Sequence, residues 1–306
     1  MQVQGISHLA VEVTDLKQSE EFYRDLLGFV SVGRDLWPDC GRSLVLQTAS
    51  GQHLVLSESE QPRSLPETGV HQAYRVAPAD RETIARKLSA REIKLHTYKE
   101  DRPPEEENNF YFYDPDGNRV QLIALQKASQ PSGKVLGIDH AAVEAYDLEW
   151  AEEFYTQALG LPVDHRTGWR TADYVRAKLW GEGREEMAPG TRRWDQRYTT
   201  MEQKRRLPRP NMQLYVRFGD AVLGVYLALE HRQDPPEEQM AGTPRVGFRV
   251  TRQGLEEAMK LLNNHRFPFH LSPYEGPVEH PVSAPIATSL YFKDLSSNFL
   301  ELCVAR

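Results

Sequence analysis

The most constraining feature of the sequence is an internal duplication. The segment Ile6-Ser-His-Leu-Ala-Val-Glu returns in the second half of the chain as Ile138-Asp-His-Ala-Ala-Val-Glu, and the match continues without a gap. Such a repeat predicts a fold built from equivalent units rather than from one continuous pattern. Each copy carries a histidine in its opening segment, His8 in the first and His140 in the second. The functional question therefore becomes a comparison of two related half-sites.

A finer repeat lies inside each half. The segment around His8 resembles the segment around His71, and in the second half the same superposition places His140 over Arg245. Every unit opens with alternating apolar and polar residues, which is the pattern of a half-buried strand. The sequence therefore predicts four units, each with the order strand, helix and three further strands.

Capping signals mark the expected helices. Thr14 or Asp15 and Asp147 are the predicted N-caps, and Gly28 and Gly160 are predicted to end the helices of the first and third units. Both of these helices contain Glu-Phe-Tyr followed by Leu-Gly. Further helices are expected at 80–90 and 254–263, and strands at 42–46, 53–56, 109–113 and 119–125.

The repeats suggest a division into two domains. The first spans 1–127, with modules 1–62 and 67–127, and the linker spans 128–135. The second domain spans 136–306, with modules 136–235 and 241–306. An insertion at 166–210, rich in arginine and tryptophan, interrupts the third module. It is too long for an ordinary connection and favours a lid or a binding loop, although a solvated surface loop or an oligomer contact is the simpler interpretation.

Composition narrows the classes of function. The chain has 306 residues, 40% hydrophobic and 26% charged, which is typical of a soluble globular protein. A net charge of −7 argues against nucleic acid as a partner. The chain lacks the run of about 18 apolar residues that a membrane span needs. The two cysteines, Cys40 and Cys303, suit buried thiols in a reducing compartment, so a cytoplasmic location is expected.

The two halves close with related segments, and these carry a family resemblance. Tyr111-Phe-Tyr-Asp-Pro-Asp-Gly-Asn ends in a strand with Gln121, and Tyr291-Phe-Lys-Asp-Leu-Ser-Ser-Asn ends in a strand with Glu301. Together with the opening histidine and the Glu-Phe-Tyr helix, this pattern resembles the vicinal oxygen chelate superfamily. That group includes the glyoxalases, the bleomycin resistance proteins and the type I extradiol dioxygenases. The resemblance implies an α+β fold in which four βαβββ modules pair into two curled mixed β-sheet domains.

The resemblance also implies a metal site in which two units share one sheet. Carried over residue by residue, the first half offers His8, His71 and Gln121, with His53 as a fourth candidate. The second half offers His140 and Glu301. Two imidazoles and a carboxylate suit Fe(II), with Mn(II) or Zn(II) as alternatives, and leave positions open for substrate oxygens.

Neither half matches the family pattern fully. Gln121 is a neutral amide where a carboxylate is expected, and Arg245 occupies a ligand position although it cannot bind a metal. The simplest interpretation is that Arg245 pairs with Glu301 and that the second site holds no metal. The resemblance to extradiol enzymes implies acid-base roles for His280 and Tyr291, but the turn after Tyr291 lacks the usual proline and glycine.

These observations leave two main hypotheses, and a third in which the chain is a decayed enzyme whose role is structural or a partner surface. The first is a metal-dependent enzyme, either an extradiol-type oxidoreductase that cleaves a catechol-type ring or a lyase of the glyoxalase type. The second is a protein of the same fold that binds a small molecule without turnover and has a degenerate metal site. Both main hypotheses imply a small molecule as the binding partner, and neither involves nucleic acid or a membrane. Both are compatible with a homo-oligomer. Fold alone does not choose between them.

Overall fold

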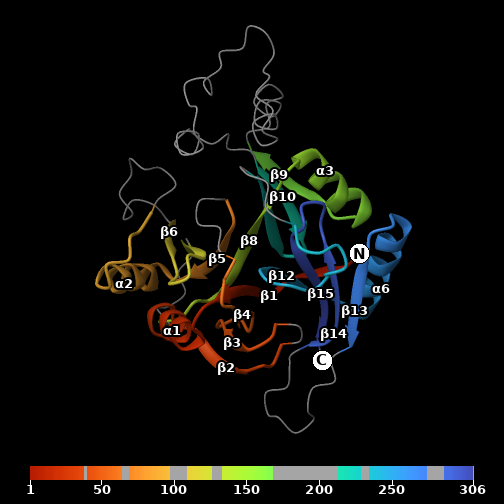
Figure 1. Ribbon diagram of the computed structural model, residues 1–306. Coiled ribbons are helices and arrows are strands. Elements are labelled where there is room, and N and C mark those ends of the chain that lie inside the picture. The colour runs from red at the N-terminus through yellow and green to blue at the C-terminus, as the bar shows by residue number, and fades with distance from the viewer. Residues whose placement is uncertain are drawn as a thin grey trace, which may run out of the picture.

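The computed structural model describes residues 1–37, 40–63, 69–96, 109–125, 133–167, 213–228, 234–273 and 286–305. His280 and nearly all of the insertion at 166–210 lie outside these ranges. Within them the fold is α+β, with two mixed β-sheets in the centre and helices on the outside (Figure 1). No helix of the described part is long and apolar enough to cross a membrane.

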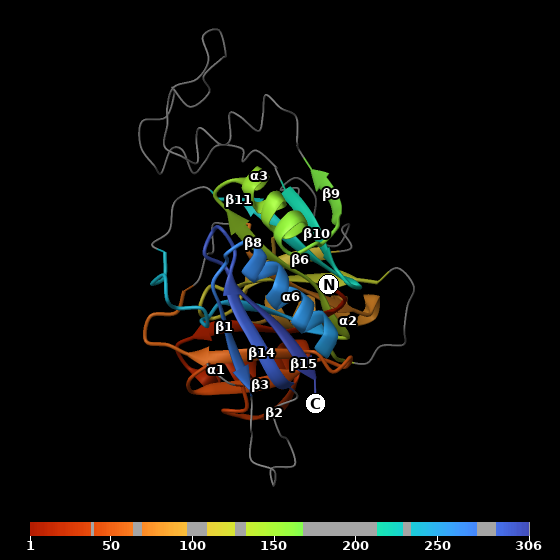
Figure 2. The same cartoon turned by 90° about the vertical axis from the view of Figure 1, so that its right-hand side faces the viewer.

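Two sheets organise the described residues. Sheet A has eight strands in the order β13 (Phe269–Pro273), β14 (Ile286–Lys293), β15 (Phe299–Ala305), β12 (Arg245–Val250), β1 (Val3–Val13), β4 (His53–Glu58), β3 (Ser43–Gln47) and β2 (Val30–Arg34). Sheet B has seven described strands in the order β6 (Asn109–Tyr113), β7 (Arg119–Ala124), β5 (His71–Val76), β8 (Gly137–Ala145), β11 (Ala221–Leu227), β10 (Gln213–Phe218) and β9 (Val163–Thr167). Figure 2 shows the two sheets in a second view.

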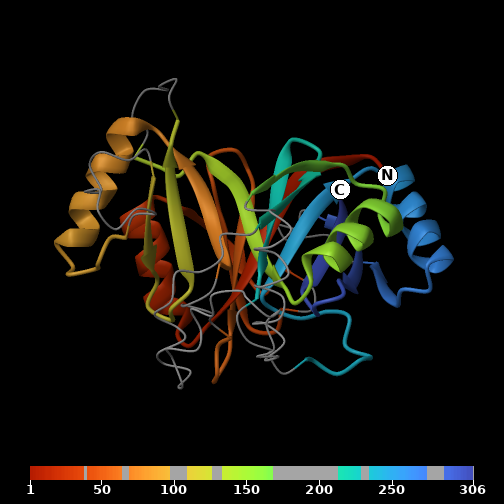
Figure 3. The ribbon, with the colours of Figure 1, turned by 90° about the horizontal axis from the view of Figure 1, so that it is seen from above.

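The helices form two pairs at opposite ends of the molecule (Figure 3). One pair is α1 (Leu16–Glu21) with α2 (Pro78–Ser89), and the other is α3 (Leu148–Glu153) with α6 (Arg252–Asn264). Both α1 and α3 run on into a π-helical turn, Phe22–Leu26 and Phe154–Ala158. A continuous apolar core packs the helices against the sheets.

The expected capping residues are confirmed. The Asp15 carboxylate accepts hydrogen bonds from the amides of Lys17 and Gln18, and Asp147 caps α3 in the same way. Gly28 and Gly160 follow the two helices with φ of +76° and +66°. Because only glycine adopts this left-handed conformation without steric cost, both positions end the helix as expected.

The expected pairing of the units is wrong. β1 of the first unit pairs antiparallel with β12 of the fourth, and β5 of the second unit pairs antiparallel with β8 of the third. Each sheet is therefore built across the two halves, not within 1–127 or 136–306. The alternating pattern of an opening strand determines which side chains face the core, but it does not determine which unit lies at the strand's free edge. The boundaries themselves stay a prediction.

Contacts between the turns and the helices join the units of each half. Tyr23 in the Glu-Phe-Tyr segment donates a hydrogen bond of 2.8 Å to Asp114, and Tyr155 donates one of 2.7 Å to Asp294. Burial, partly offset by these and other hydrogen bonds, raises the pKa of the Asp114 carboxyl to about 6. The two recurring motifs of the sequence are thus hydrogen-bonded partners that tie each closing turn to a helix of the preceding unit.

Candidate functional site

The registers of the two sheets place the candidate residues at equivalent positions. In sheet A, His8 lies opposite Gly247, and Gly247 lies beside Glu301. In sheet B, His140 lies opposite Ala73, and Ala73 lies beside Gln121. Two positions before Gly247 and Ala73 stand the remaining members of each set, Arg245 and His71. We call His8, Arg245 and Glu301 site A, and we call His140, His71 and Gln121 site B.

This arrangement corrects both expected ligand sets. His8 and His71 lie in different sheets, so the set His8, His71 and Gln121 does not form one site. His140 and Glu301 are separated in the same way. The reason is that the opening strands pair across the two halves of the chain. His8 therefore shares a sheet with Arg245, and His71 shares a sheet with His140.

Site B is built around two facing imidazoles. The Nε2 atoms of His71 and His140 lie 2.9 Å apart. His71 Nδ1 lies 2.7 Å from the carbonyl oxygen of Gly69, and His140 Nδ1 lies 2.8 Å from the carboxylate of Asp139. Because both partners are acceptors, each Nδ1 carries a proton, and the neutral form of each ring presents a lone pair at Nε2. Two unprotonated nitrogens at this distance repel each other unless a cation lies between them.

Burial disfavours a positive charge on His71. Burial, with the nearby His140, holds the pKa of His71 well below its ordinary value, against a weaker opposing effect of Gly69 and Gln121. The neutral form of His71 is therefore favoured at neutral pH. The arrangement fits a divalent metal, because an imidazole whose Nδ1 is anchored to a carbonyl or carboxylate is the usual form of a histidine ligand.

Gln121 completes site B with an oriented amide. Its Nε2 donates to the side-chain oxygen of Asn109 at 3.2 Å, which fixes the direction of the amide. Its Oε1 is buried and has no hydrogen-bond partner among the described residues. An unsatisfied buried oxygen at the sheet position that Glu301 occupies in site A fits a third metal ligand.

Aromatic rings surround His71. Tyr111 and Tyr226 meet its ring edge-to-face, with centroids 5.6 and 5.8 Å away, and the Arg119 guanidinium lies 4.3 Å above the Tyr111 ring. Burial, with the nearby Tyr215, raises the pKa of Tyr226, so its hydroxyl stays protonated. Site B therefore combines two imidazoles with aromatic walls and the guanidinium of Arg119.

Site A has the same frame but contains its own cation. Glu301 Oε2 lies 2.9 Å from Arg245 Nε and 3.0 Å from His8 Nε2, and Glu301 Oε1 accepts a hydrogen bond of 2.6 Å from Ser289. Burial raises the pKa of Glu301, but these three partners outweigh it and bring the value down to about 2. The expected pairing of Arg245 with Glu301 is confirmed.

Other parts of the chain fill the rest of site A. Arg245 also contacts Cys40 Sγ at 3.1 Å, and its guanidinium lies 4.8 Å from the ring centroid of Tyr291. The Trp37 ring lies 4.2 Å from the ring of His8. The sequence gives no signal for Trp37 or Cys40, because neither belongs to the repeated motifs.

A metal at site A would have to overcome two obstacles. His8, Glu301 and Cys303 bring ligand atoms within 4.8 Å of one another, as a metal site does. However, the guanidinium of Arg245 already contacts Glu301, and its positive charge repels a metal ion. Burial raises the pKa of the Cys303 thiol to about 12, so it is protonated and a poor ligand.

Two of the remaining candidates, Tyr291 and His53, lie around site A. Tyr291 is fully buried on β14, directly opposite Glu301. His53 lies beside His8 on the neighbouring strand, and burial, with the nearby His8 and Arg249, lowers its pKa to about 4. His280 lies outside the described residues. The catalytic roles of Tyr291 and His280 stay predictions.

Known proteins resemble the chain at two levels. The chain is 30% identical over 123 residues to the glutathione transferase FosA of Serratia marcescens, which covers 39% of this chain and 80% of the relative. It is 29% identical over 122 residues to the metallothiol transferase FosB of Staphylococcus epidermidis, which covers 39% of this chain and 83% of the relative.

The fold matches over nearly the full length. A candidate dioxygenase from Bacillus subtilis superposes with a TM-score of 0.62 at 12% identity, covering 99% of this chain and 86% of that one. Glyoxalase I from Zea mays superposes with a TM-score of 0.55 at 15% identity, covering 98% and 92%. A family model matches residues 5–122. From these findings, the chain belongs to the Glyoxalase/Bleomycin resistance protein/Dioxygenase superfamily.

Proposed function

We propose that the chain is a metal-dependent enzyme that works from site B, with His71, His140 and Gln121 as the metal ligands. Its substrate would be a small molecule with neighbouring oxygen atoms, of the catechol or the oxo-hydroxy type. The observation that carries this proposal is the pair of lone-pair nitrogens 2.9 Å apart, both oriented by acceptors behind them.

The chemistry of the donors supports Fe(II) as the first candidate metal, with Mn(II) or Zn(II) as alternatives. Imidazoles bind iron and zinc well, and a neutral ligand set leaves the full charge of the metal to act on the substrate. When bound, such a metal polarises and orients the substrate oxygens. The same neutrality should weaken metal retention, because Gln121 replaces a carboxylate.

The chain's own residues would bind and orient the substrate. Tyr111 and Tyr226 provide flat apolar walls next to His71. Arg119 adds a positive charge beside Tyr111 that favours an ionised substrate oxygen. Asp139, which accepts from His140, holds that imidazole in the tautomer a ligand needs. His280 and Tyr291 remain acid-base candidates of the sequence resemblance, and Tyr291 lies in the other sheet from site B.

Metal analysis of the purified protein tests this proposal. We expect His71→Ala and His140→Ala to lose at least tenfold of the bound metal. His165→Ala is the matched control, because it removes an exposed imidazole from the same sheet and should retain the metal. If the wild type binds none of Fe(II), Mn(II) and Zn(II), or if His140→Ala binds as well as wild type, site B is not a metal site.

The second candidate function is binding without turnover. Gln121 favours this function, because a neutral amide in place of a carboxylate weakens the metal site but leaves the surrounding pocket able to bind a small molecule. Oxygen uptake with catechols and isomerisation of hemithioacetals by the metal-loaded protein distinguish the two. Binding of a catechol to site B without conversion would support the second candidate over the first.

A further inference from the structure

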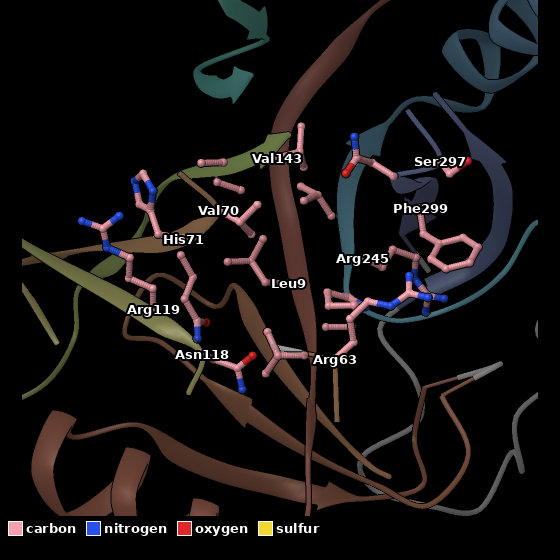
Figure 4. Close-up of a pocket in the computed structure, with 18 residues that line it drawn as sticks. Leu9, Arg63, Val70, His71, Asn118, Arg119, Val143, Arg245, Ser297 and Phe299 are labelled. Atoms are coloured by element: carbon pink, nitrogen blue, oxygen red, sulfur yellow. The ribbon is translucent and has the colours of Figure 1, made fainter. Parts of the chain in front are cut away.

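A groove lies between the two sheets, beside site B (Figure 4). Its described lining takes in His71 but neither His140 nor Gln121. The lining segments come in equivalent pairs, 9–11 with 141–143, 70–72 with 244–246, and 118–119 with 298–299. The groove therefore lies where the two related sheets meet, and all four units contribute to it.

The middle of the groove is apolar. Leu9, Val70 and Val143 lie there in Figure 4, between His71 and Arg119 on one flank and Arg245 and Phe299 on the other. Leu9 is 3% exposed and Val143 is 6% exposed. Water forms few hydrogen bonds with these apolar side chains, so the apolar part of a ligand would displace it favourably.

Among the described residues that line the groove, two of the three arginines are engaged with other groups. Arg245 pairs with Glu301, and Arg119 lies over the Tyr111 ring. Arg63 lines the groove and is only half-buried, and its guanidinium forms no ion pair with another residue of the described ranges.

The backbone around Arg63 is held in place. Its amide donates to one carboxylate oxygen of Glu12 at 2.6 Å, and the other oxygen of Glu12 accepts from the Thr243 hydroxyl at 2.7 Å. Glu12 thus anchors the chain at Arg63 through the backbone, while the guanidinium keeps its donors for a ligand. A planar guanidinium matches a carboxylate with two parallel hydrogen bonds.

We propose that this groove binds a small carboxylate with an apolar body, with Arg63 holding the carboxylate and Leu9, Val70 and Val143 lining the body. One unengaged cation suits one negative charge, so a monoanion fits better than a phosphate dianion. Binding here does not require a metal at site B. The groove shares His71 with site B, so its ligand would contact one residue of the proposed metal site. Only this last statement rests on the proposed function.

Calorimetric titration with octanoate tests the proposal on the full-length protein. We expect octanoate to bind the wild type at least tenfold more tightly than octanol, which lacks the charge, and than inorganic phosphate, which lacks the apolar body. Arg63→Gln should weaken octanoate binding at least tenfold, and Arg63→Lys should weaken it less. Arg42→Gln is the matched control, because Arg42 is an exposed arginine outside the groove and should leave binding unchanged.

Failure of the groove and failure of the metal site are distinguishable. His140→Ala should lose metal yet bind octanoate like the wild type, and Arg63→Gln should keep its metal. The proposal is overturned if the wild type does not bind octanoate, if octanol or phosphate binds equally well, or if Arg63→Gln binds as tightly as Arg42→Gln.

Discussion

Sites A and B occupy equivalent positions in two related sheets, yet their charges are satisfied in opposite ways. Site A contains a buried carboxylate, Glu301, and a buried guanidinium, Arg245, which contact each other directly. Site B contains two imidazole lone pairs that face each other and an amide oxygen with no hydrogen-bond partner in the described structure. The same set of sheet positions can therefore hold an arginine of the chain as its cation, or it can stay open for a cation from solution.

The exchange of one residue type accounts for most of this difference. Arg245 stands where site B has His71, and it brings its positive charge to the position that a metal would neutralise. Trp37 and Cys40 then pack over the guanidinium and His8, which closes site A to solvent. Under the proposed function, site A stabilises the fold and site B holds the metal.

The largest effect is expected from breaking the ion pair of site A. Glu301→Ala leaves Arg245 buried without its anion and should lower the free energy of unfolding by ~3–5 kcal/mol. Gln121→Ala, the equivalent change in site B, removes a neutral amide with one weak hydrogen bond and should cost ~1 kcal/mol or less without metal. Urea denaturation of both variants measures the difference. Equal losses would contradict a structural role that belongs to site A.

The pH dependence of stability sharpens the same point. The folded-state pKa of Glu301 is lowered from 4.5 to about 2, so the folded protein binds the proton less well than the unfolded chain does. Its stabilisation is complete above about pH 4.5 and is lost as the pH falls towards 2. The stability gap between wild type and Glu301→Ala should narrow over this range. A gap that stays constant would mean that Glu301 is not ionised in the folded protein.

Metal removal should act on site B alone. A ligand present at a hundredfold of its dissociation constant stabilises the folded state by ~2.7 kcal/mol. A chelator should therefore lower the melting temperature of the metal-loaded wild type and of His165→Ala, but not that of His140→Ala. A shift of the same size in His140→Ala would place the metal elsewhere.

Replacing Gln121 with glutamate should make site B more like the family pattern. A carboxylate adds charge to the ligand set, and we expect the metal affinity to rise at least tenfold, which corresponds to ~1.4 kcal/mol. Direct titration of the metal-free protein measures the change. Unchanged affinity would show that residue 121 does not reach the metal.

The smallest effects concern the turns that both halves share. Tyr23→Phe and Tyr155→Phe each remove one hydrogen bond to an aspartate and should cost ~1 kcal/mol. Tyr23 also accepts a hydrogen bond of 2.8 Å from Gln72, so its loss should be the greater of the two. Thermal denaturation compares them, and a greater cost at Tyr155 would contradict this ranking.

Much of the fold follows from the sequence, because it rests on local signals. The strand at 109–113 was predicted with the observed limits, and the caps at Asp15 and Asp147 lie where the sequence places them. The sequence predicts a further strand after the first helix but does not place it, because β2 is mostly exposed and its valines mark no buried face. The superposition of Arg245 on His71 and of Glu301 on Gln121 also holds in the sheet registers.

The grouping of the site could not be predicted from the same signals. His71 and His140 are equally compatible with a partner from either neighbouring unit, because edge pairing depends on backbone hydrogen bonds that every sequence can form. The roles of Asp139, Asn109 and Gly69 were missed for a related reason. Each acts through one hydrogen bond to a ligand, and only adjacent Asp139 is visible as a motif beside its histidine.

The cross-half pairing has a consequence for the order in which the protein assembles. All described strands of sheet B lie between residues 71 and 227, whereas sheet A joins the first unit to the last. During synthesis, the inner sheet can close while the opening strand β1 still lacks β12. Sheet B, which holds the paired imidazoles, can thus form on the ribosome before sheet A, which holds the buried arginine, is complete.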